Sequence, residues 1–372
     1  MSPPCILVTG FPTSFLALRV VRKLLRDTPD SRLRLVVQSK SLERARELLA
    51  DMEGATPGRV HVLEGDAASI DMGLSGAEWV ALSGEVNIIH HCMAVTYLGA
   101  EREFATAANV GGIREAVELA EAAPNFERLV HWSSALVSGA KRGYVLEQDL
   151  DASRGFRNVV EKTRFQAERI AREALDGGLP VTILRPSLIV GDSLTGEIDR
   201  LEGPYLLVTL MLHAPSDLRI PMPGPGDVKL NLVPIDFVVD AGLHIASLPS
   251  SVGETFHLVD PKPLTTRRIF ELIAARTGRQ PPRGFVPAGW ATTLMRTPGL
   301  ERFANIPRTF LEHLLTDVVY DDRQARRALE GAGITCPSFE TYVDRLVHYV
   351  EDREASRRHE QVEAFVDSDP LE

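Results

Sequence analysis

The apolar positions of the first 190 residues fall into short runs separated by helical patterns. Six runs of four or five residues are bounded by turn or polar residues. They are Cys5–Val8, Leu33–Val37, Val60–Leu63, Val86–His90, Leu129–Trp132 and Val181–Leu184. Short, continuous apolar runs of this kind are typical of parallel strands that are buried on both faces of a sheet.

Helical patterns lie between these runs, at Phe15–Leu25, Ser41–Asp51, Ile113–Ala122 and Val160–Ala174. In the second of them the apolar residues recur every three or four positions with charged residues between them, as on an amphipathic helix. Alternation of strands and helices implies right-handed crossovers. The pattern therefore predicts an α/β fold with a Rossmann-type, doubly wound parallel sheet and a ligand site at the carboxyl ends of its strands.

The alternation ends after residue 190. Residues 191–229 are rich in glycine and proline, which indicates a loop over a ligand cleft or a surface excursion. A helix at Asp236–Ala246 and a strand at Thr255–Val259 return to the sheet, and residues 262–352 read as mostly helical, with N-caps at Thr265 and Ser338. We predict a Rossmann domain from 1–190 and 230–260, a smaller, mostly helical C-terminal lobe from 191–229 and 261–352, and a charged tail, frayed helix or coil, at 353–372.

Composition excludes several classes of function. The net charge of -10 disfavours a nucleic-acid partner, because phosphate binding needs a concentrated basic surface. The sequence has no run of 18 or more apolar residues, so it predicts no membrane span. An apolar strand follows Met1 almost at once, without a basic region or cleavage site, so we expect a cytoplasmic protein. The three cysteines are far apart, which predicts neither disulfides nor a metal site, and Cys5 and Cys92 read as core residues.

The turn after the first strand is the place where a dinucleotide pyrophosphate would bind, held by backbone N–H groups and by the positive end of the helix dipole. Gly10 is the one glycine in this turn. Two further glycines are expected, and the sequence has Thr13 or Ser14, and Leu16 or Ala17, in their places. A hydroxyl of Thr13 or Ser14 could donate to a phosphate, whereas a Cβ at a position of positive φ is costly. A corner that binds nothing is the alternative.

The second and third strands suggest which nucleotide would bind. No acidic residue follows the second strand to accept from a ribose 2′-hydroxyl, and Lys40 with Ser39 suits a 2′-phosphate better. We therefore expect NADP rather than NAD, with NAD or no cofactor as alternatives. Asp66 follows the third strand and could accept from an adenine amino group, although an aspartate there also forms turns.

A series of short motifs resembles the extended short-chain dehydrogenase/reductases over residues 5 to about 350. In chain order the motifs are Thr9-Gly10, Gly65-Asp66, His91-Cys92-Met93-Ala94, Asn109-Val110-Gly111-Gly112, Ser133-Ser134, Arg185-Pro186-Ser187 and Gly191-Asp192. The stretches 137–168 and 185–193 are most similar to the thioester reductase and fatty acyl-CoA reductase branch. The resemblance implies NADPH-dependent reduction of an acyl thioester to an aldehyde or alcohol, and it places Thr9, Ala94, Asn109 and Pro186 at the cofactor.

The resemblance also implies a serine that holds the substrate oxygen, a tyrosine that exchanges the proton and a lysine one helical turn later that lowers the tyrosine pKa. Ser134 occupies the serine position. Val160 stands at the tyrosine position and Arg164 at the lysine position, where a guanidinium keeps the charge and could bind a ribose. Lys162 is two residues away from either position and faces another side of the helix.

A displaced proton donor is one hypothesis, with Tyr144 as the first candidate and Tyr97 and His91 as others. Each also has an ordinary interpretation, as a loop, packing or core-edge residue. Asn109 could order a relay water or hold a helix in place.

Two functional interpretations follow. In the first, the chain is an NADP-dependent oxidoreductase of the acyl-thioester type with weakened or non-standard catalysis, in which Ser134 positions a carbonyl and Arg164 anchors the ribose; its substrate is a small acyl or lipid-like molecule. In the second, the chain is a non-catalytic binding or scaffold protein, a pseudoenzyme that reuses the fold. A homodimer is compatible with both.

Overall fold

The computed structural model describes residues 3–97, 99–201, 204–213, 222–286, 314 and 316–366. The chain forms two compact units. The first unit contains Met1–Ser187, Ile235–Pro261 and Val318–Thr335, and the second contains Leu188–Pro234, Lys262–Asp317 and Cys336–Glu372. These units differ from the predicted domains mainly in residues 318–335, which belong to the first unit.

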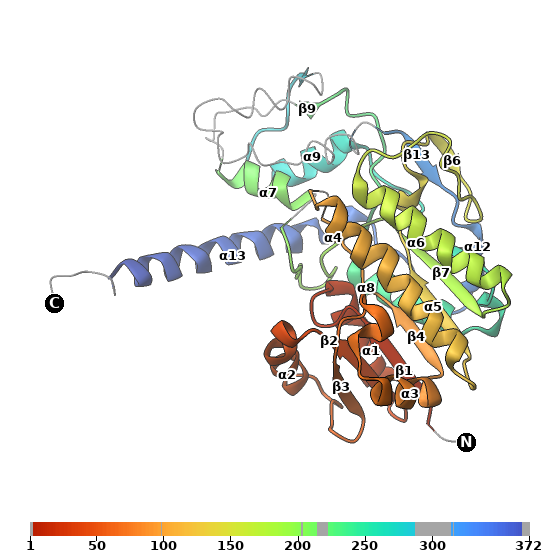
Figure 1. Ribbon diagram of the computed structural model, residues 1–372. Coiled ribbons are helices and arrows are strands. Elements are labelled where there is room, and N and C mark those ends of the chain that lie inside the picture. Colours follow the sequence, from red (N-terminus) through yellow and green to blue (C-terminus); the bar gives the residue numbers. More distant parts are fainter. Residues whose placement is uncertain are drawn as a thin grey trace. The chain divides into compact units, whose positions relative to one another are not determined.

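A seven-stranded parallel sheet forms the centre of the first unit (Figure 1). Its strands are β1 (Cys5–Thr9), β2 (Arg32–Val37), β3 (Val60–Glu64), β4 (Ile88–His91), β5 (Arg128–Trp132), β7 (Val181–Pro186) and β11 (Thr255–Leu258). Their order is β11-β7-β5-β4-β1-β2-β3, which reverses direction between β1 and β4. The predicted doubly wound fold is confirmed, because every strand pair is parallel and the order changes direction beside the first strand.

Helices cover both faces of this sheet. They are α1 (Phe15–Asp27), α2 (Leu42–Ala50), α3 (Gly76–Glu85), α4 (Arg102–Thr106), α5 (Gly112–Ala122), α6 (Val159–Asp176) and α8 (Ile235–Ser247). The helices α3, α5 and α6 pack together on one face, and α1 packs against α8 on the other. The predicted helices are present to within a few residues. Helix α3 was not predicted, although Ser75 and Glu78 form a complete capping box that marks its first turn.

One cluster of the hydrophobic core lies between the sheet and α3, α5 and α6, with Leu7, Ile89 and Leu129 on the strands and Ile113 and Ala171 on the helices. Cys5 and Cys92 are buried free thiols, as predicted for core residues. Burial raises the pKa of the Cys5 thiol to about 11 and raises the pKa of the Cys92 thiol well above its ordinary value. Both thiols are therefore inert packing groups at neutral pH.

A late segment completes the first unit. Strand β13 (Val318–Tyr320) pairs in parallel with β6 (Gly143–Val145), and α12 (Arg323–Ala328) packs against β11. Tyr320 is buried with Ala135, Val145 and Val259 in a small cluster of its own. The structure places this segment in the first unit, whereas the sequence prediction placed it in the C-terminal lobe. The sequence pattern could not reveal this, because the pairing partner of β13 lies about 175 residues earlier in the chain.

Within its described residues, the second unit contains the helices α7 (Pro204–His213), α9 (Thr266–Arg276) and α13 (Phe339–Val366). Two short strand pairs are also described there, β8 (Leu188–Val190) with β10 (Leu232–Pro234) and β9 (Met222–Pro223) with β12 (Phe285–Val286). Thr265 caps α9, as predicted. The interpretation of residues 191–229 as loop alone is wrong, because α7 lies within them. It was missed because its residues are apolar on every side and show no helical alternation.

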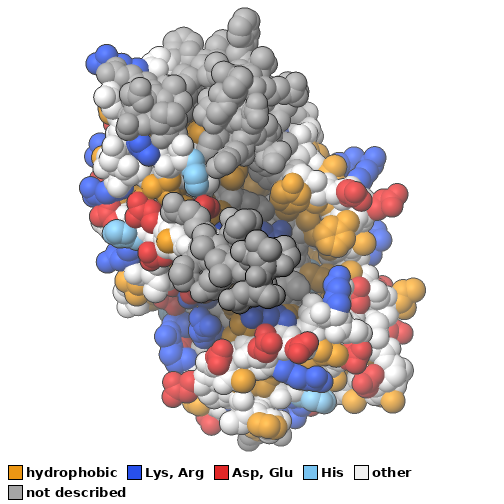
Figure 2. All heavy atoms as spheres, turned by 90° about the vertical axis from the view of Figure 1, so that its left-hand side faces the viewer, with side chains coloured by type: hydrophobic (Ala, Val, Ile, Leu, Met, Phe, Trp, Pro, Cys, Tyr) orange, Lys and Arg blue, Asp and Glu red, His pale blue; other side chains and the backbone are white. Residues whose placement is uncertain are grey.

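Helix α13 extends through most of the predicted charged tail, and residues 367–372 of that tail lie outside the described residues. Much of the helical prediction for residues 262–352 falls on 287–313, which are also outside them. No helix within the described ranges is long and apolar enough to cross a membrane. On the face shown in Figure 2, Lys and Arg side chains are interspersed with Asp and Glu side chains.

Candidate functional site

The turn between β1 and α1 needs one glycine, and the chain has it. Gly10 has a φ of +92°, and a Cβ there would lie 2.9 Å from both the N and the Cα of Met93. Ser14 has a φ of -92° and Ala17 is fully buried inside α1, so neither position demands glycine. The expected strain of side chains in this turn therefore does not arise, and the loop lies close against the segment that follows β4.

The hydroxyls of this turn are engaged within the protein. Ser14 is the N-cap of α1: its Oγ accepts from the N–H of Ala17 at 3.2 Å and donates to the carbonyl of Cys92 at 3.3 Å. The exposed Thr13 donates to the carbonyl of Gly10 at 3.2 Å. The fully buried Thr9 accepts from the N–H of Met93 at 3.3 Å. These contacts shape the turn, and a pyrophosphate at this site would meet mainly backbone N–H groups and the helix dipole.

The edge formed by β2 and β3 carries both signs of charge. Lys40 is exposed in a turn after β2, whereas the hydroxyl of Ser39 donates to the carboxylate of Glu64 at 2.5 Å. Glu64 ends β3 and was not predicted as part of the site, since nothing in the sequence pairs it with Ser39. Asp66 accepts from the N–H of Ala68 at 3.1 Å and so forms a turn. Lys40 is the cation that the structure places at this edge.

Asn109 connects two segments beside the sheet. Its buried side chain accepts from the N–H of Val95 at 2.7 Å and donates to the carbonyl of Val95 at 3.3 Å and to the hydroxyl of Thr163 at 2.9 Å. It lies in the π-helical turn Ala107–Gly111 between α4 and α5. Of the two roles left open for Asn109, the structure shows the holding role, between the segment after β4 and α6.

The serine pair follows β5 directly. Ser134 is 7% exposed, its hydroxyl accepts from the N–H of Leu136 at 3.2 Å, and it lies 3.5 Å from the carbonyl of Pro186. Ser133 is 1% exposed and donates to Glu168 at 2.6 Å. The structure therefore brings Ser134 and Pro186 together at the carboxyl ends of β5 and β7, the edge of the sheet at which the sequence predicts the site.

Helix α6 presents Arg164 to the same strand end. Asn158 caps the helix, and Val160 and Arg164 lie on its buried face, one turn apart. The Nη2 of Arg164 donates to the carbonyls of Trp132 and Ser133 at 3.0 and 2.7 Å. Burial lowers the pKa of Arg164 to about 10, so the guanidinium stays charged at neutral pH. The exposed Lys162 points away from this face, as expected from its spacing.

A small cavity lies beside Arg164, lined by Met93, Ala94, Asn109, His131, Trp132, Arg164 and Ala167. The Nε and Nη1 of Arg164 and the Nδ1 of His131 are buried, and none of them has a hydrogen-bond partner among the described residues. A buried polar group without a partner is costly, so this cavity is suited to groups that accept hydrogen bonds.

Two stacked histidines adjoin this cavity. The rings of His91 and His131 lie 5.6 Å apart, and the Nδ1 of His91 lies 3.0 Å from the hydroxyl of Thr9. Burial lowers the pKa of His131 to about 4, and it lowers the pKa of His91 well below its ordinary value. Both imidazoles are neutral at physiological pH. His131 was missed because its place in β5 reads as an ordinary strand position, and only the register of β4 with β5 sets it beside His91.

The tyrosines considered as displaced proton donors lie on the surface. Tyr144 is 73% exposed in β6, and Tyr97 is 43% exposed after β4. Within the described part of the chain, no hydrogen bond joins either of them to Ser134 or Arg164. The structure places Ser134 against Pro186, and Arg164 with Asn109 and Ala94 around one cavity, whereas the side chain of Tyr144 is mostly exposed.

Comparison with known proteins places the chain in a family of reductase-like proteins. The family model of the male sterility protein matches residues 8–242. The fatty acyl-CoA reductase wat of Drosophila melanogaster is 27% identical over 276 residues, which are 63% of this chain and 52% of that protein. A linear gramicidin synthase of Brevibacillus parabrevis is 27% identical over 364 residues, or 91% of this chain and 7% of that protein. The chain thus spans about half the length of these relatives or less.

Among solved structures, the terminal R domain of the myxalamid PKS-NRPS biosynthetic pathway superposes with a TM-score of 0.80 and 26% sequence identity. The match covers 95% of this chain and 92% of that domain, which includes both compact units. The similarity therefore extends over the whole architecture rather than over the nucleotide-binding half alone.

Proposed function

The chain belongs to the male sterility protein family, within the thioester-reductase branch of the extended short-chain dehydrogenase/reductases, and from this premise we propose that it is an NADP-dependent reductase of acyl thioesters. The observation that carries the proposal is Arg164, a buried cation at the carboxyl end of β5 whose Nε and Nη1 have no hydrogen-bond partner among the described residues. The name of one relative, a fatty acyl-CoA reductase, supports an acyl substrate that is bound as a thioester.

The residues fit a dinucleotide. Gly10 lets the backbone approach a pyrophosphate at the start of α1, and Lys40 supplies a cation for a 2′-phosphate. The unpartnered Nε and Nη1 of Arg164 are suited to the hydroxyl oxygens of a ribose. When bound, NADPH supplies the hydride. This chain contributes the fixed donors around the reacting carbonyl.

Reduction of a thioester to an aldehyde makes a modest demand on a proton donor. The carbonyl oxygen carries negative charge only transiently, before the carbon–sulfur bond breaks, and the proton is finally taken by the departing thiolate. A thiol has a pKa of about 8.5, so water can protonate the departing thiolate near neutral pH. The site must mainly stabilise the oxyanion, for which Ser134 is placed. Val160 at the tyrosine position is therefore compatible with this reaction.

The direct test is a titration with NADPH and NADH, followed by a screen of acyl-CoA thioesters of different chain lengths for nucleotide oxidation. We expect micromolar binding of NADPH, weaker binding of NADH, and release of free thiol in step with nucleotide oxidation. An absence of binding by either nucleotide would refute the proposal and would favour a protein that reuses the fold for partner binding.

Lys40 offers a charge test of cofactor choice. Lys40→Glu should raise the Kd for NADPH about tenfold, because a charge-assisted contact to the 2′-phosphate is replaced by repulsion, and it should leave the Kd for NADH unchanged. Lys162→Glu is the matched control, since Lys162 is also exposed but lies on α6. If the two substitutions raise the Kd for NADPH equally, Lys40 acts only through the net charge of the protein.

Restoring the usual pair separates an enzyme from a scaffold. In the proposed thioester reductase, Val160→Tyr with Arg164→Lys should raise kcat by no more than about tenfold, because protonation of the departing thiolate does not limit the rate, and a positioned acid contributes about 10²-fold or more only where protonation is limiting. Val160→Phe with Arg164→Lys is the control, since it has the same bulk at a buried position without the hydroxyl. If the wild type and both double variants fold but oxidise no NADPH, the non-catalytic interpretation is favoured. The observation that supports that interpretation is the buried, apolar Val160.

A further inference from the structure

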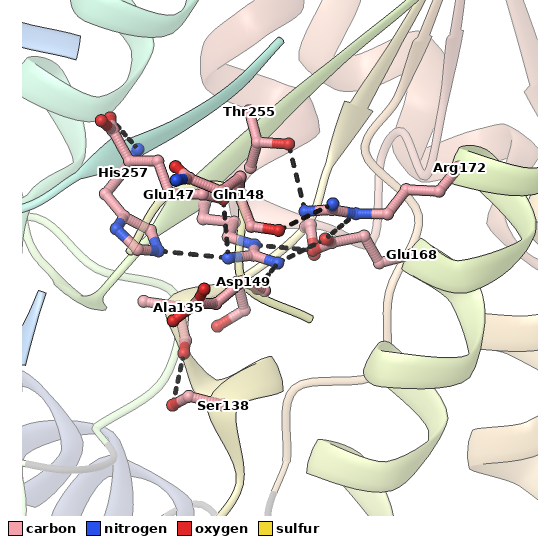
Figure 3. A network of polar contacts seen from close by, with 12 residues as sticks. Ala135, Ser138, Glu147, Gln148, Asp149, Glu168, Arg172, Thr255 and His257 are labelled. Atoms are coloured by element: carbon pink, nitrogen blue, oxygen red, sulfur yellow. Dashed lines mark hydrogen bonds and ion pairs between the residues drawn. The ribbon is translucent and has the colours of Figure 1, made fainter. Parts of the chain in front are cut away.

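A buried carboxylate lies directly beneath the serine pair. Glu168, on α6, has no exposed surface and accepts from the Nη2 and Nε of Arg185 at 2.6 and 2.9 Å, from Arg172 at 3.0 Å and from the hydroxyl of Ser133 at 2.6 Å. Figure 3 shows Glu168 beside Arg172. Burial opposes ionisation, but the two guanidiniums outweigh it and lower the pKa of Glu168 to about 2. The carboxylate is therefore ionised at every physiological pH.

Helix α6 holds the peptide from Trp132 to Ser134 at two points. Arg164 donates to two of its carbonyls, and Glu168, one turn later on the same helix face, accepts from the side chain of Ser133. The two contacts act on neighbouring atoms from one rigid element. Ser134, the next residue, makes no hydrogen bond to α6 within the described part of the chain, so this peptide is what links it to the helix.

The partners of Glu168 are themselves held in place. Arg185, on β7, also donates to the carbonyls of Glu147 and Asp149 at 3.1 and 2.7 Å, and it lies 3.3 Å from the Nε2 of His257. The carboxylate of Glu147 accepts from the N–H groups of His257, Gln324 and Ala325. The network thus joins α6, β7, β11 and the late segment with α12, and Figure 3 shows Glu147, Asp149, Glu168 and His257 converging within it.

We propose that Glu168 is a positioning residue for the candidate site: through the hydroxyl of Ser133 it fixes the peptide that presents Ser134 to the acyl carbonyl. The role rests on the proposed reductase function and extends it to a residue that touches neither substrate nor cofactor. Rigid placement matters because a displacement of about 1 Å at a reacting group reduces turnover by about 100-fold.

Ser133→Ala isolates this contact. It removes one hydrogen bond and leaves the arginine partners of Glu168 intact, so the fold should persist. We expect kcat to fall about 10- to 100-fold with KM and the Kd for NADPH within about twofold of the wild type. Ser133→Thr keeps the hydroxyl and should restore kcat to within about threefold. Ser83→Ala is the control: Ser83 is a buried serine on α3 that donates to a backbone carbonyl, and its loss should leave kcat unchanged.

A second readout does not depend on activity. Trp132 adjoins Ser133 and is 2% exposed, and the chain's other tryptophans, Trp79 and Trp290, can be replaced by phenylalanine. Acrylamide quenching of Trp132 should rise about twofold in Ser133→Ala and stay unchanged in Ser133→Thr and Ser83→Ala. Unchanged quenching in Ser133→Ala overturns the proposal, and so does increased quenching with wild-type kcat. If the wild type reduces no thioester, the reductase assignment fails, and the quenching alone decides whether Glu168 holds this peptide.

Discussion

Replacing Arg185 with methionine should lower the free energy of unfolding of the first unit by about 3 kcal/mol or more, because it removes one partner of a buried ion pair. Arg185 and Glu168 both have no exposed surface, and their closest atoms are 2.6 Å apart. Without the guanidinium, Glu168 keeps Arg172, which is partly exposed, as its cationic partner, and the carbonyls of Glu147 and Asp149 lose a donor. Urea unfolding followed by Trp132 fluorescence measures the loss.

Arg169→Met, on the helix α6 that carries Glu168, provides the matched control. Arg169 pairs with Glu173 at the surface, where both side chains are more than half exposed, and such pairs contribute about 0.5 kcal/mol or less. The loss of free energy of unfolding in Arg185→Lys should fall between the losses in Arg185→Met and Arg169→Met, because lysine keeps the charge but not the forked geometry. A loss below about 1 kcal/mol in Arg185→Met would mean that the network contributes little to stability.

Gly10→Ala should raise the Kd for NADPH at least about 100-fold and should lower the free energy of unfolding by about 1 to 3 kcal/mol. The φ of +92° is strained for any side chain, and the added Cβ would meet the backbone of Met93, which cannot move as a flexible side chain can. The turn must therefore shift, and with it the backbone that would meet the pyrophosphate. Nucleotide titration and urea unfolding of the same variant measure both effects.

Gly84→Ala separates strain from the mere addition of a methyl group. Gly84 lies in α3 with no heavy atom within 4 Å of the added Cβ, and its φ is not positive. Alanine there should stabilise the protein by up to about 1 kcal/mol through its higher helix propensity and leave NADPH binding unchanged. Unaltered nucleotide binding in Gly10→Ala would show that the turn is not part of a cofactor site.

The elements of the sheet could be predicted because their causes are local. Runs such as Cys5–Val8 and Val181–Leu184 are apolar without alternation, and that property alone marks a strand buried on both faces. The position of Gly10 at the end of the first strand likewise indicates a turn with positive φ. The order of the motifs along the chain was enough to indicate the reductase branch, which the family match bears out.

The partners of buried polar groups could not be predicted in the same way. Arg185 and the serine pair were singled out as motif residues, but nothing in the sequence says that Arg185 lies against Glu168 or that Ser133, rather than Ser134, contacts it. The same holds for the stacking of His91 on His131 and for the contact of Ser39 with Glu64. These pairs are joined by strand order and helix packing, which depend on the whole chain.

The sequence by itself determined the fold class, the order of the strands along the chain, the turn at Gly10 and the substitution of Val160 and Arg164 in the helix that usually carries tyrosine and lysine. Tertiary structure alone decided that residues 318–335 complete the first unit, that Tyr144 is exposed, and that a buried carboxylate contacts Ser133. The physical reason is range: hydrophobic periodicity and turn chemistry act over a few residues, whereas hydrogen bonds and ion pairs in the core join groups that only the folded chain brings within about 3 Å of each other.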